Sequence, residues 1–193
     1  MSSTETDRRA IRQRLIAARE ALPPNLRQQL TARIASHLGR LLDQLRPQTL
    51  GFCWPFRGEA DLCEFLGHWR SQGAGRQLAL PVVPASAGPL AFHAWVPGDA
   101  LVMDRFGIPA PQGTPAVQPD AVLVPVNGFD ARGYRIGYGG GFFDRTLAAL
   151  HPAPISIGIG FEIARLDDVQ PAPHDLALDW IVTESGVVVK PTA

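Results

Sequence analysis

The sequence is poor in cysteine, has no excess charge of either sign and contains no long hydrophobic run. Cys53 and Cys63 form no Cys-x-x-Cys pair, which argues against a zinc site or a disulfide framework and favours two small buried side chains. The 18 basic and 18 acidic residues cancel, so no overall field attracts nucleic acid or an anionic membrane. No segment is apolar over the thickness of a bilayer, and the N-terminal MSSTETDRRAIRQR lacks the apolar centre of a signal peptide. We therefore expect a cytoplasmic protein with neither a nucleic-acid nor a membrane partner.

Length and hydrophobic periodicity predict one α/β domain over residues 1–193. The chain is long enough to bury a core, and 46% of its residues are hydrophobic. Helices are expected over 5–21, about 25–45, 61–71 and 142–151, the first with an apolar stripe of Ile11, Leu15, Ala18 and Leu22. Short apolar runs predict strands at 49–54, 77–83, 90–95, 120–126, 155–161, 179–185 and 187–190, and the Pro- and Gly-rich stretch 96–119 predicts a connection. This alternation indicates a single layered domain with a largely parallel sheet flanked by helices.

Glycines are clustered in the segment GYRIGYGGGFFDR at 133–145, where four of the five residues from 137 to 141 are glycine. Successive glycines let neighbouring N–H groups converge on one anion, and a helix that starts near Gly141 adds its positive dipole end. The P-loop pattern fails because no Lys-Ser/Thr follows, and Phe142 stands where the dinucleotide fingerprint needs its third glycine. A triphosphate cradle is favoured over a tight turn without a ligand, because Arg135, Asp144 and Arg145 adjoin the glycines.

The same segment, preceded by DAVLVPVNGFD, resembles the signature of the 5-formyltetrahydrofolate cyclo-ligase (5,10-methenyltetrahydrofolate synthetase) family. Other landmarks of that family are matched in order along nearly the whole chain by RRAIR, CWPFRGEADL, FGIPAP and PAPHDLALDWIVTESGV. The resemblance implies a Rossmann-like topology, of the kind found in sugar-phosphate isomerases and CoA transferases. It also implies an ATP- and Mg²⁺-dependent enzyme, a cyclo-ligase that converts 5-formyltetrahydrofolate to 5,10-methenyltetrahydrofolate. The formyl oxygen is phosphorylated on the way, and ADP and phosphate are released.

The resemblance also implies which residues form the site. ATP, the co-substrate, is expected to contact Arg8, Arg12, Arg135, Gly137, Tyr138, Gly139, Gly140, Gly141, Phe142 and Phe143. The folate substrate is expected to contact Trp54, Glu59, Tyr138, Gly139, Gly140, Gly141 and Phe142. Asp144 and Asp175 are expected to hold Mg²⁺, which needs only one or two carboxylates beside phosphate oxygens and waters. Catalytic roles are expected for Tyr138 and Arg145, since phosphoryl transfer depends on positioning and charge neutralisation.

Each of these residues has a structural alternative that the sequence leaves open. Arg8 and Arg12, four apart on one helix face, are expected to contact phosphate, whereas a solvated basic face is expected of Arg9, Arg14 and Arg19. The alternative for Asp144 is a salt bridge or a first-turn helix charge, and the alternative for Asp175 is a loop cap. His174 is expected to be a structural hydrogen-bonder. Glu59 is alternatively a surface acid, and the aromatic side chains are alternatively packing residues, namely Trp54, Tyr138, Phe142 and Phe143.

Three positions depart from the pattern of the family. Arg8 stands where lysine is usual, Asn127-Gly128 replaces a Gly-Leu-Ala-like segment, and Ala110 stands where an acid is common. These changes leave two alternatives beside the cyclo-ligase. One is a diverged paralogue that binds nucleotide or folate without turnover, and the other is a different enzyme on a similar scaffold, such as a sugar-phosphate isomerase-like protein. The expected partners are the two small-molecule substrates, and the expected assembly is a monomer or a weak homodimer.

Overall fold

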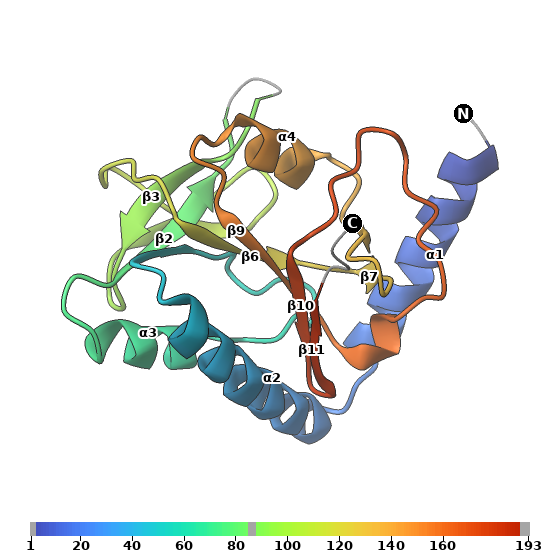
Figure 1. The fold of residues 1–193 in the computed structure, drawn as a ribbon, viewed down its shortest axis with the longest axis horizontal. Coiled ribbons are helices and arrows are strands. Elements are labelled where there is room, and N and C mark those ends of the chain that lie inside the picture. The colour runs from blue at the N-terminus through green and yellow to red at the C-terminus, as the bar shows by residue number, and fades with distance from the viewer. Residues whose placement is uncertain (1–2, 85–87, 190–193) are drawn as a thin grey trace.

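A seven-stranded sheet forms the centre of the computed structural model, which describes residues 3–84 and 88–189 (Figure 1). The strand order is β11 (Gly186–Val189), β10 (Trp180–Thr183), β9 (Ile155–Ile159), β6 (Ala121–Pro125), β1 (Thr49–Gly51), β2 (Gln77–Val82) and β3 (Ala91–Trp95). Neighbouring strands from β10 to β2 are parallel, and the edge strands β11 and β3 run antiparallel to them. The expected layered α/β domain with a largely parallel sheet is confirmed.

Two helices, α2 (Pro24–Leu45) and α3 (Cys63–Ser71), cover one face of the sheet (Figure 1). Helical spacing places four apolar side chains of α2 on its sheet-facing side, and all four are buried: Ile34, Leu38, Leu41 and Leu42. They form one core with apolar side chains from the central strands, among them Leu50, Leu78, Leu80, Leu123 and Ile157. The sequence periodicity of this helix is therefore explained by burial against the sheet.

The opposite face of the sheet packs against α4 (Phe142–Ala149) (Figure 1). Val122 and Val124 of β6 belong to this second core, together with Phe143 and Leu147 of α4. Leu123, which lies between the two valines, belongs to the core on the other face. Because β6 is covered on both faces, its residues are continuously apolar and do not alternate with polar ones. The short helix α4, which begins directly after the glycine run, is thereby fixed to the sheet.

The first helix, α1 (Ser3–Glu20), lies beside β7 (Gly128–Phe129) and the 3-10 turn η1 (Glu162–Ala164) (Figure 1). Its side chains Leu15 and Ile16 are buried, while the other members of the expected stripe are partly buried, namely Ile11, Ala18 and Leu22. The Leu15 Cδ1 atom lies 3.0 Å from the place that a Cβ on Gly128 would occupy. A glycine at this position therefore lets α1 approach β7 closely, which gives the Asn127-Gly128 departure a packing reason.

Two short ribbons form where the sequence predicted only connections. One pairs β4 (Leu101–Met103) with β5 (Pro109–Pro111), and the other pairs β7 with β8 (Arg135–Ile136). The turn between β7 and β8 is held by the fully buried carboxylate of Asp130, which accepts hydrogen bonds from Arg132 N at 2.9 Å and Tyr134 N at 3.3 Å. Local hydrogen bonds form this ribbon, and they leave no periodic pattern in the sequence. Ala110 is buried in β5, so its methyl group suits the position.

The remaining differences concern the ends of elements. The strand predicted over 49–54 ends at Gly51, and the strand predicted over 187–190 occupies Gly186–Val189, with Lys190 outside the described residues. Within the described ranges, no helix has the length and hydropathy needed to cross a membrane.

Candidate active site

A cleft of about 610 Å³ lies between α1, the glycine run and the segment 170–175. This volume is in the range of small-molecule sites. The structure brings together at this cleft every residue expected to contact ATP and both carboxylates expected to hold Mg²⁺: Arg8, Arg12, Arg135, Gly137, Tyr138, Gly139, Gly140, Gly141, Phe142, Phe143, Asp144 and Asp175. These residues are far apart in the sequence, and the docking of α1 is what brings Arg12 against the glycine run.

Arginine side chains lie against two glycines of the run. Gly139 has φ +93, and a Cβ there would stand 3.2 Å from the guanidinium carbon of Arg12. Gly141 has φ +63, and a Cβ there would stand 2.8 Å from Nη1 of Arg145. The positive φ values make a larger residue strained at both positions, and a Cβ would also require the neighbouring guanidinium to shift. The run ends in the N-terminus of α4, whose unpaired N–H groups favour an anion.

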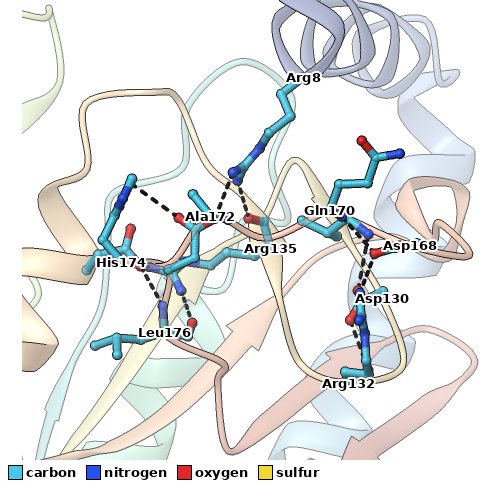
Figure 2. Close-up of polar contacts among 12 residues, drawn as sticks. Arg8, Asp130, Arg132, Arg135, Asp168, Gln170, Ala172, His174 and Leu176 are labelled. Atoms are coloured by element: carbon cyan, nitrogen blue, oxygen red, sulfur yellow. Dashed lines mark hydrogen bonds and ion pairs between the residues drawn. The ribbon is translucent and has the colours of Figure 1, made fainter. Parts of the chain in front are cut away.

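Two arginines of α1 bind the rim of the cleft. Arg12 Nε donates to the carbonyl of Gly137 at 2.6 Å, and Arg8 Nη1 donates to Asp175 Oδ2 at 2.7 Å. Arg8 also contacts the carbonyl of Arg135 through Nη2 at 3.4 Å, and Figure 2 shows its side chain reaching from α1 toward that strand. Arg8 and Arg12 are thus held at the cleft by protein acceptors, and phosphate oxygens are acceptors of the same kind.

The two acids of the cleft are tied to one loop. Arg135, whose side chain is 5% exposed, donates to Asp144 Oδ1 at 2.9 Å, and the N–H of Leu176 donates to the same oxygen at 3.1 Å. Asp175 Oδ2 accepts from Ala172 N at 2.8 Å as well as from Arg8. Asp144 therefore makes the salt bridge, and Asp175 the loop contact, that the sequence left open as structural alternatives. Two carboxylates on one cleft also fit Mg²⁺, which takes its remaining ligands from phosphate and water.

No group of three or more His, Cys, Asp and Glu side chains in residues 3–84 and 88–189 is arranged to hold a metal without other ligands. His174 is 80% exposed, and its Nε2 lies 3.9 Å from Asp175 Oδ1. The two carboxylates that line the cleft, Asp144 and Asp175, match a metal that takes its other ligands from phosphate and water.

The loop that carries Asp175 is anchored at its other end by a second cluster. Arg132 donates to the buried Asp130 at 2.7 Å and also to Asp168, and Val169 N donates to Asp130 Oδ2 at 3.1 Å. Figure 2 shows this cluster beside the Arg8 contacts. One wall of the cleft is thus fixed at both of its ends.

Glu59 lines a second, smaller cavity of about 30 Å³ and not the cleft itself. Its side chain is 11% exposed, and Oε1 accepts a hydrogen bond of 2.6 Å from the hydroxyl of Tyr138. Burial raises the pKa of Glu59, and the hydrogen bond from Tyr138, the charge of Arg19 and the N–H of Phe56 oppose this rise. Because Tyr138 lines the cleft, its bond to Glu59 joins the two cavities.

Two of the expected site residues line neither cavity. Trp54 is partly buried and packs on the core, with its ring 5.8 Å from that of Trp95 at 86°. Arg145 donates from Nη2 to the carbonyl of Gly140 at 2.8 Å, and its guanidinium lies 5.2 Å from the centre of the Phe142 ring. The structure thus gives Trp54 its packing alternative and places Arg145 against the glycine run.

Arg19 was expected on a solvated face, and that prediction is wrong. The residue is 5% exposed, and it donates to Asn127 Oδ1 at 2.8 Å and to the hydroxyl of Tyr138 at 2.9 Å. A signal was present in the sequence, because Arg19 lies four residues after the buried Leu15 and seven after Arg12. Its partners Asn127 and Tyr138 are more than 100 residues away, and no local pattern identifies them.

Phe106 is a second residue that the sequence did not assign to the site. It is 49% exposed, lies between β4 and β5, and its ring is 6.0 Å from that of Phe142 in an edge-to-face arrangement. An exposed aromatic ring beside the cleft provides a flat apolar surface for a ligand ring.

Comparison with known proteins identifies the family. The sequence model of the 5-formyltetrahydrofolate cyclo-ligase family matches residues 4–184. The 5-formyltetrahydrofolate cyclo-ligase of Escherichia coli K12 is 32% identical over 185 residues, covering 92% of this chain and 98% of that protein. The structure of Aquifex aeolicus 5,10-methenyltetrahydrofolate synthetase has the same fold, with a TM-score of 0.82 at 24% identity over 96% of this chain and 94% of that one. A Mycoplasma pneumoniae 5,10-methenyltetrahydrofolate synthetase gives 0.74 at 23% identity, over 92% and 99%. The chain belongs to the 5-formyltetrahydrofolate cyclo-ligase family.

Proposed function

We propose that the protein is an ATP- and Mg²⁺-dependent cyclo-ligase that converts 5-formyltetrahydrofolate to 5,10-methenyltetrahydrofolate and releases ADP and phosphate. Family membership supports the reaction. The observation that carries the proposal for this chain is the adjacency of two unlike cavities. A cleft rich in arginine and glycine meets a small cavity with a buried carboxylate, and the Tyr138–Glu59 hydrogen bond lies between them.

The chemistry requires this adjacency. The oxygen of a formamide is a very poor leaving group, so ring closure needs that oxygen to be phosphorylated first. The γ-phosphoryl group moves to the formyl oxygen, N10 of the folate then attacks the activated carbon and gives up its proton to water, and phosphate leaves. The γ-phosphate and the formyl group must therefore meet, which two adjoining cavities permit.

The cleft is proposed to bind ATP through its phosphates. Arg8 and Arg12 reach the cleft from α1, and the glycine run, which Arg12 contacts, lines the same cleft. Asp144 and Asp175 would hold Mg²⁺, which supplies neutralisation of the charge on the transferring group when bound. Arg135 and Arg8 pair with these two acids in the structure. Each arginine therefore stands where it can turn from a carboxylate to a phosphate oxygen.

The small cavity is proposed to open onto the pterin. A cavity of about 30 Å³ holds only one or two waters. The pterin must therefore approach from the cleft side, where Tyr138 stands, and donate its N–H groups to Glu59 beside the Tyr138 hydroxyl. A buried carboxylate suits such N–H donors, because a charge-assisted hydrogen bond is strong in a dry site.

One assay tests the proposal. 5-Formyltetrahydrofolate is incubated with the protein, and the absorbance of the methenyl product is followed with Mg-ATP, with ATP and a chelator, and without ATP. Product that appears only with Mg-ATP supports the cyclo-ligase. Folate binding without product in any arm identifies the paralogue without turnover. Product formation that does not depend on ATP contradicts the phosphorylation step.

A further inference from the structure

Arg19 makes several polar contacts, and some of them involve residues of the proposed site. Its Nε donates to the carbonyl of Arg57 at 3.0 Å, Nη1 donates to Asn127 Oδ1 at 2.8 Å, and Nη2 donates to the hydroxyl of Tyr138 at 2.9 Å. The same Nη2 lies 3.8 Å from Glu59 Oε1. Arg19 therefore contacts both partners of the hydrogen bond that lies between the two cavities.

These contacts fix the direction of that hydrogen bond. An arginine is always protonated and only donates, so the Tyr138 hydroxyl must accept from Arg19. The hydroxyl's own hydrogen is then left for Glu59 Oε1, 2.6 Å away. A single orientation of the phenol satisfies both neighbours.

Asn127 supports this role of Arg19. Its side chain is 2% exposed, and its Oδ1 faces Arg19, while its Nδ2 has no hydrogen-bond partner within the described part of the chain. A buried donor without a partner is costly. The amide is therefore oriented so that Oδ1 accepts from Arg19, although this leaves Nδ2 without an acceptor among the described residues. Asn127, which departs from the family pattern, thus has a role in holding Arg19.

We propose that Arg19 is a positioning residue that keeps Glu59 ionised and Tyr138 directed at it, and so presets the carboxylate that receives the folate. The inference rests on the proposed function, because it assigns Glu59 to folate binding. Arg19 does not touch the reacting atoms in this proposal, and its effect passes through Glu59 and Tyr138.

The position of Arg19 on α1 adds a second consequence. Arg8, Arg12 and Arg19 are spaced by four and seven residues, so they project from one side of the helix. Arg8 and Arg12 line the cleft, and Arg19 reaches Glu59 of the small cavity. One helix thus places the cations of both cavities at a fixed separation.

The charged and titratable groups that face Glu59 determine how Arg19 affects it. Burial raises the pKa of Glu59, and the hydrogen bond from Tyr138, the charge of Arg19 and the N–H of Phe56 lower it. The thiol of Cys53 also faces Glu59, and both burial and the carboxylate raise its pKa, so it stays neutral. Removal of the Arg19 charge therefore raises the pKa of Glu59 further, and a higher pH is then needed to ionise it.

The test compares Arg19→Gln and Arg19→Lys with Arg14→Gln, a matched control because Arg14 is exposed on the same helix. With 5-formyltetrahydrofolate and Mg-ATP, Arg19→Gln is expected to raise KM for the folate about tenfold or more, and KM for ATP by less than about twofold. The acid limb of the pH profile of kcat/KM for the folate should move to higher pH. Arg19→Lys keeps the charge, so its acid limb should stay near that of the wild type. Arg14→Gln should match the wild type in all three quantities.

The outcomes separate this inference from the function on which it rests. A wild-type protein that makes no methenyl product contradicts the proposed function itself. A wild type that turns over, together with an Arg19→Gln variant whose folate KM and acid limb are unchanged, overturns the role of Arg19 alone. Equal rises in both KM values indicate a purely structural role and also overturn it. If Arg19→Gln does not fold, Arg19→Lys decides by the same comparison of the two KM values.

Discussion

Replacement of Gly139 by alanine tests the link between bare backbone and phosphate binding. Gly139 has φ +93, a conformation that L residues rarely adopt, and its Cβ would stand 3.2 Å from the guanidinium carbon of Arg12. The variant therefore combines backbone strain with displacement of one arginine. Arg12 cannot move freely, because its Nε is bonded to the carbonyl of Gly137 at 2.6 Å.

The two effects have separate magnitudes. The strain of a positive φ costs about 1–2 kcal/mol, which lowers the Tm of a domain of this size by about 2–8 °C. Displacement of Arg12 by a few tenths of an ångström weakens a charge-assisted contact worth about 1.5–3 kcal/mol, so we expect the Kd for ATP to rise about tenfold or more.

Two other glycines separate these effects. Gly113 has φ +75, and no atom of residues 3–84 and 88–189, its own chain neighbours aside, comes within 4 Å of the place that a Cβ would occupy, so Gly113→Ala carries the strain without touching Arg12. Gly137 has open space and no positive φ, so Gly137→Ala should leave the Tm unchanged. Calorimetric titration with ATP and thermal melts are measured for all three variants and the wild type.

A Gly139→Ala protein that melts earlier but binds ATP as tightly as the wild type would refute the role of Arg12 at the phosphates. Weakened ATP binding of the same size in Gly113→Ala would show that general destabilisation, and not the position of Arg12, causes the loss.

Four further outcomes follow from the contacts of single side chains. Arg12→Ala should raise the KM for ATP about tenfold while the KM for folate changes much less, as steady-state kinetics would show. Asp144→Asn should reduce kcat by a larger factor than it raises the Kd for folate, measured by turnover and by titration, because the metal acts on the transferring group. Asp130→Ala leaves the buried N–H of Val169 and two partly buried N–H groups of the β7–β8 turn without their acceptor, and should cost about 3 kcal/mol of stability in urea unfolding. Burial raises the pKa of Glu59 above the ordinary 4.5, so its contribution to stability is present below that pH and is lost as pH rises through the raised pKa. The unfolding free energy of the wild type should therefore fall relative to Glu59→Gln as pH rises from about 4 to about 8, and a constant difference would contradict the burial argument.

Elements with both faces buried, or with a helical stripe, were predictable from the sequence. The buried residues of α2 recur at helical spacing, and those of β6 form a continuous apolar run. Both patterns can be read over a short stretch of sequence, because the whole helix face or strand is buried. The ribbon of β4 and β5 was not predictable in this way. Its strands have three residues each, and Pro109 and Pro111 are residues that strands disfavour.

The residues of the site also differ in whether a local sequence pattern identifies them. The glycine run and its neighbouring charges indicated an anion site from local composition alone. Glu59 and Asp175 were assigned to the site only by the resemblance to a family, because a single acidic residue in a loop forms no recognisable sequence pattern. Arg19 was missed because its burial depends on Asn127, Tyr138 and Glu59, and tertiary packing alone brings these residues to it.

The placement of α1 has a consequence for the temperature at which the protein loses activity. The helix supplies cations to both cavities, yet it packs chiefly on β7 and η1, beside the central sheet. A peripheral helix of this kind can detach while the sheet and its two cores persist, because local opening needs less free energy than global unfolding. Thermal inactivation should then set in at temperatures where circular dichroism still reports an intact β-sheet. In that case the docking of α1, and not the stability of the sheet, sets the temperature at which activity is lost.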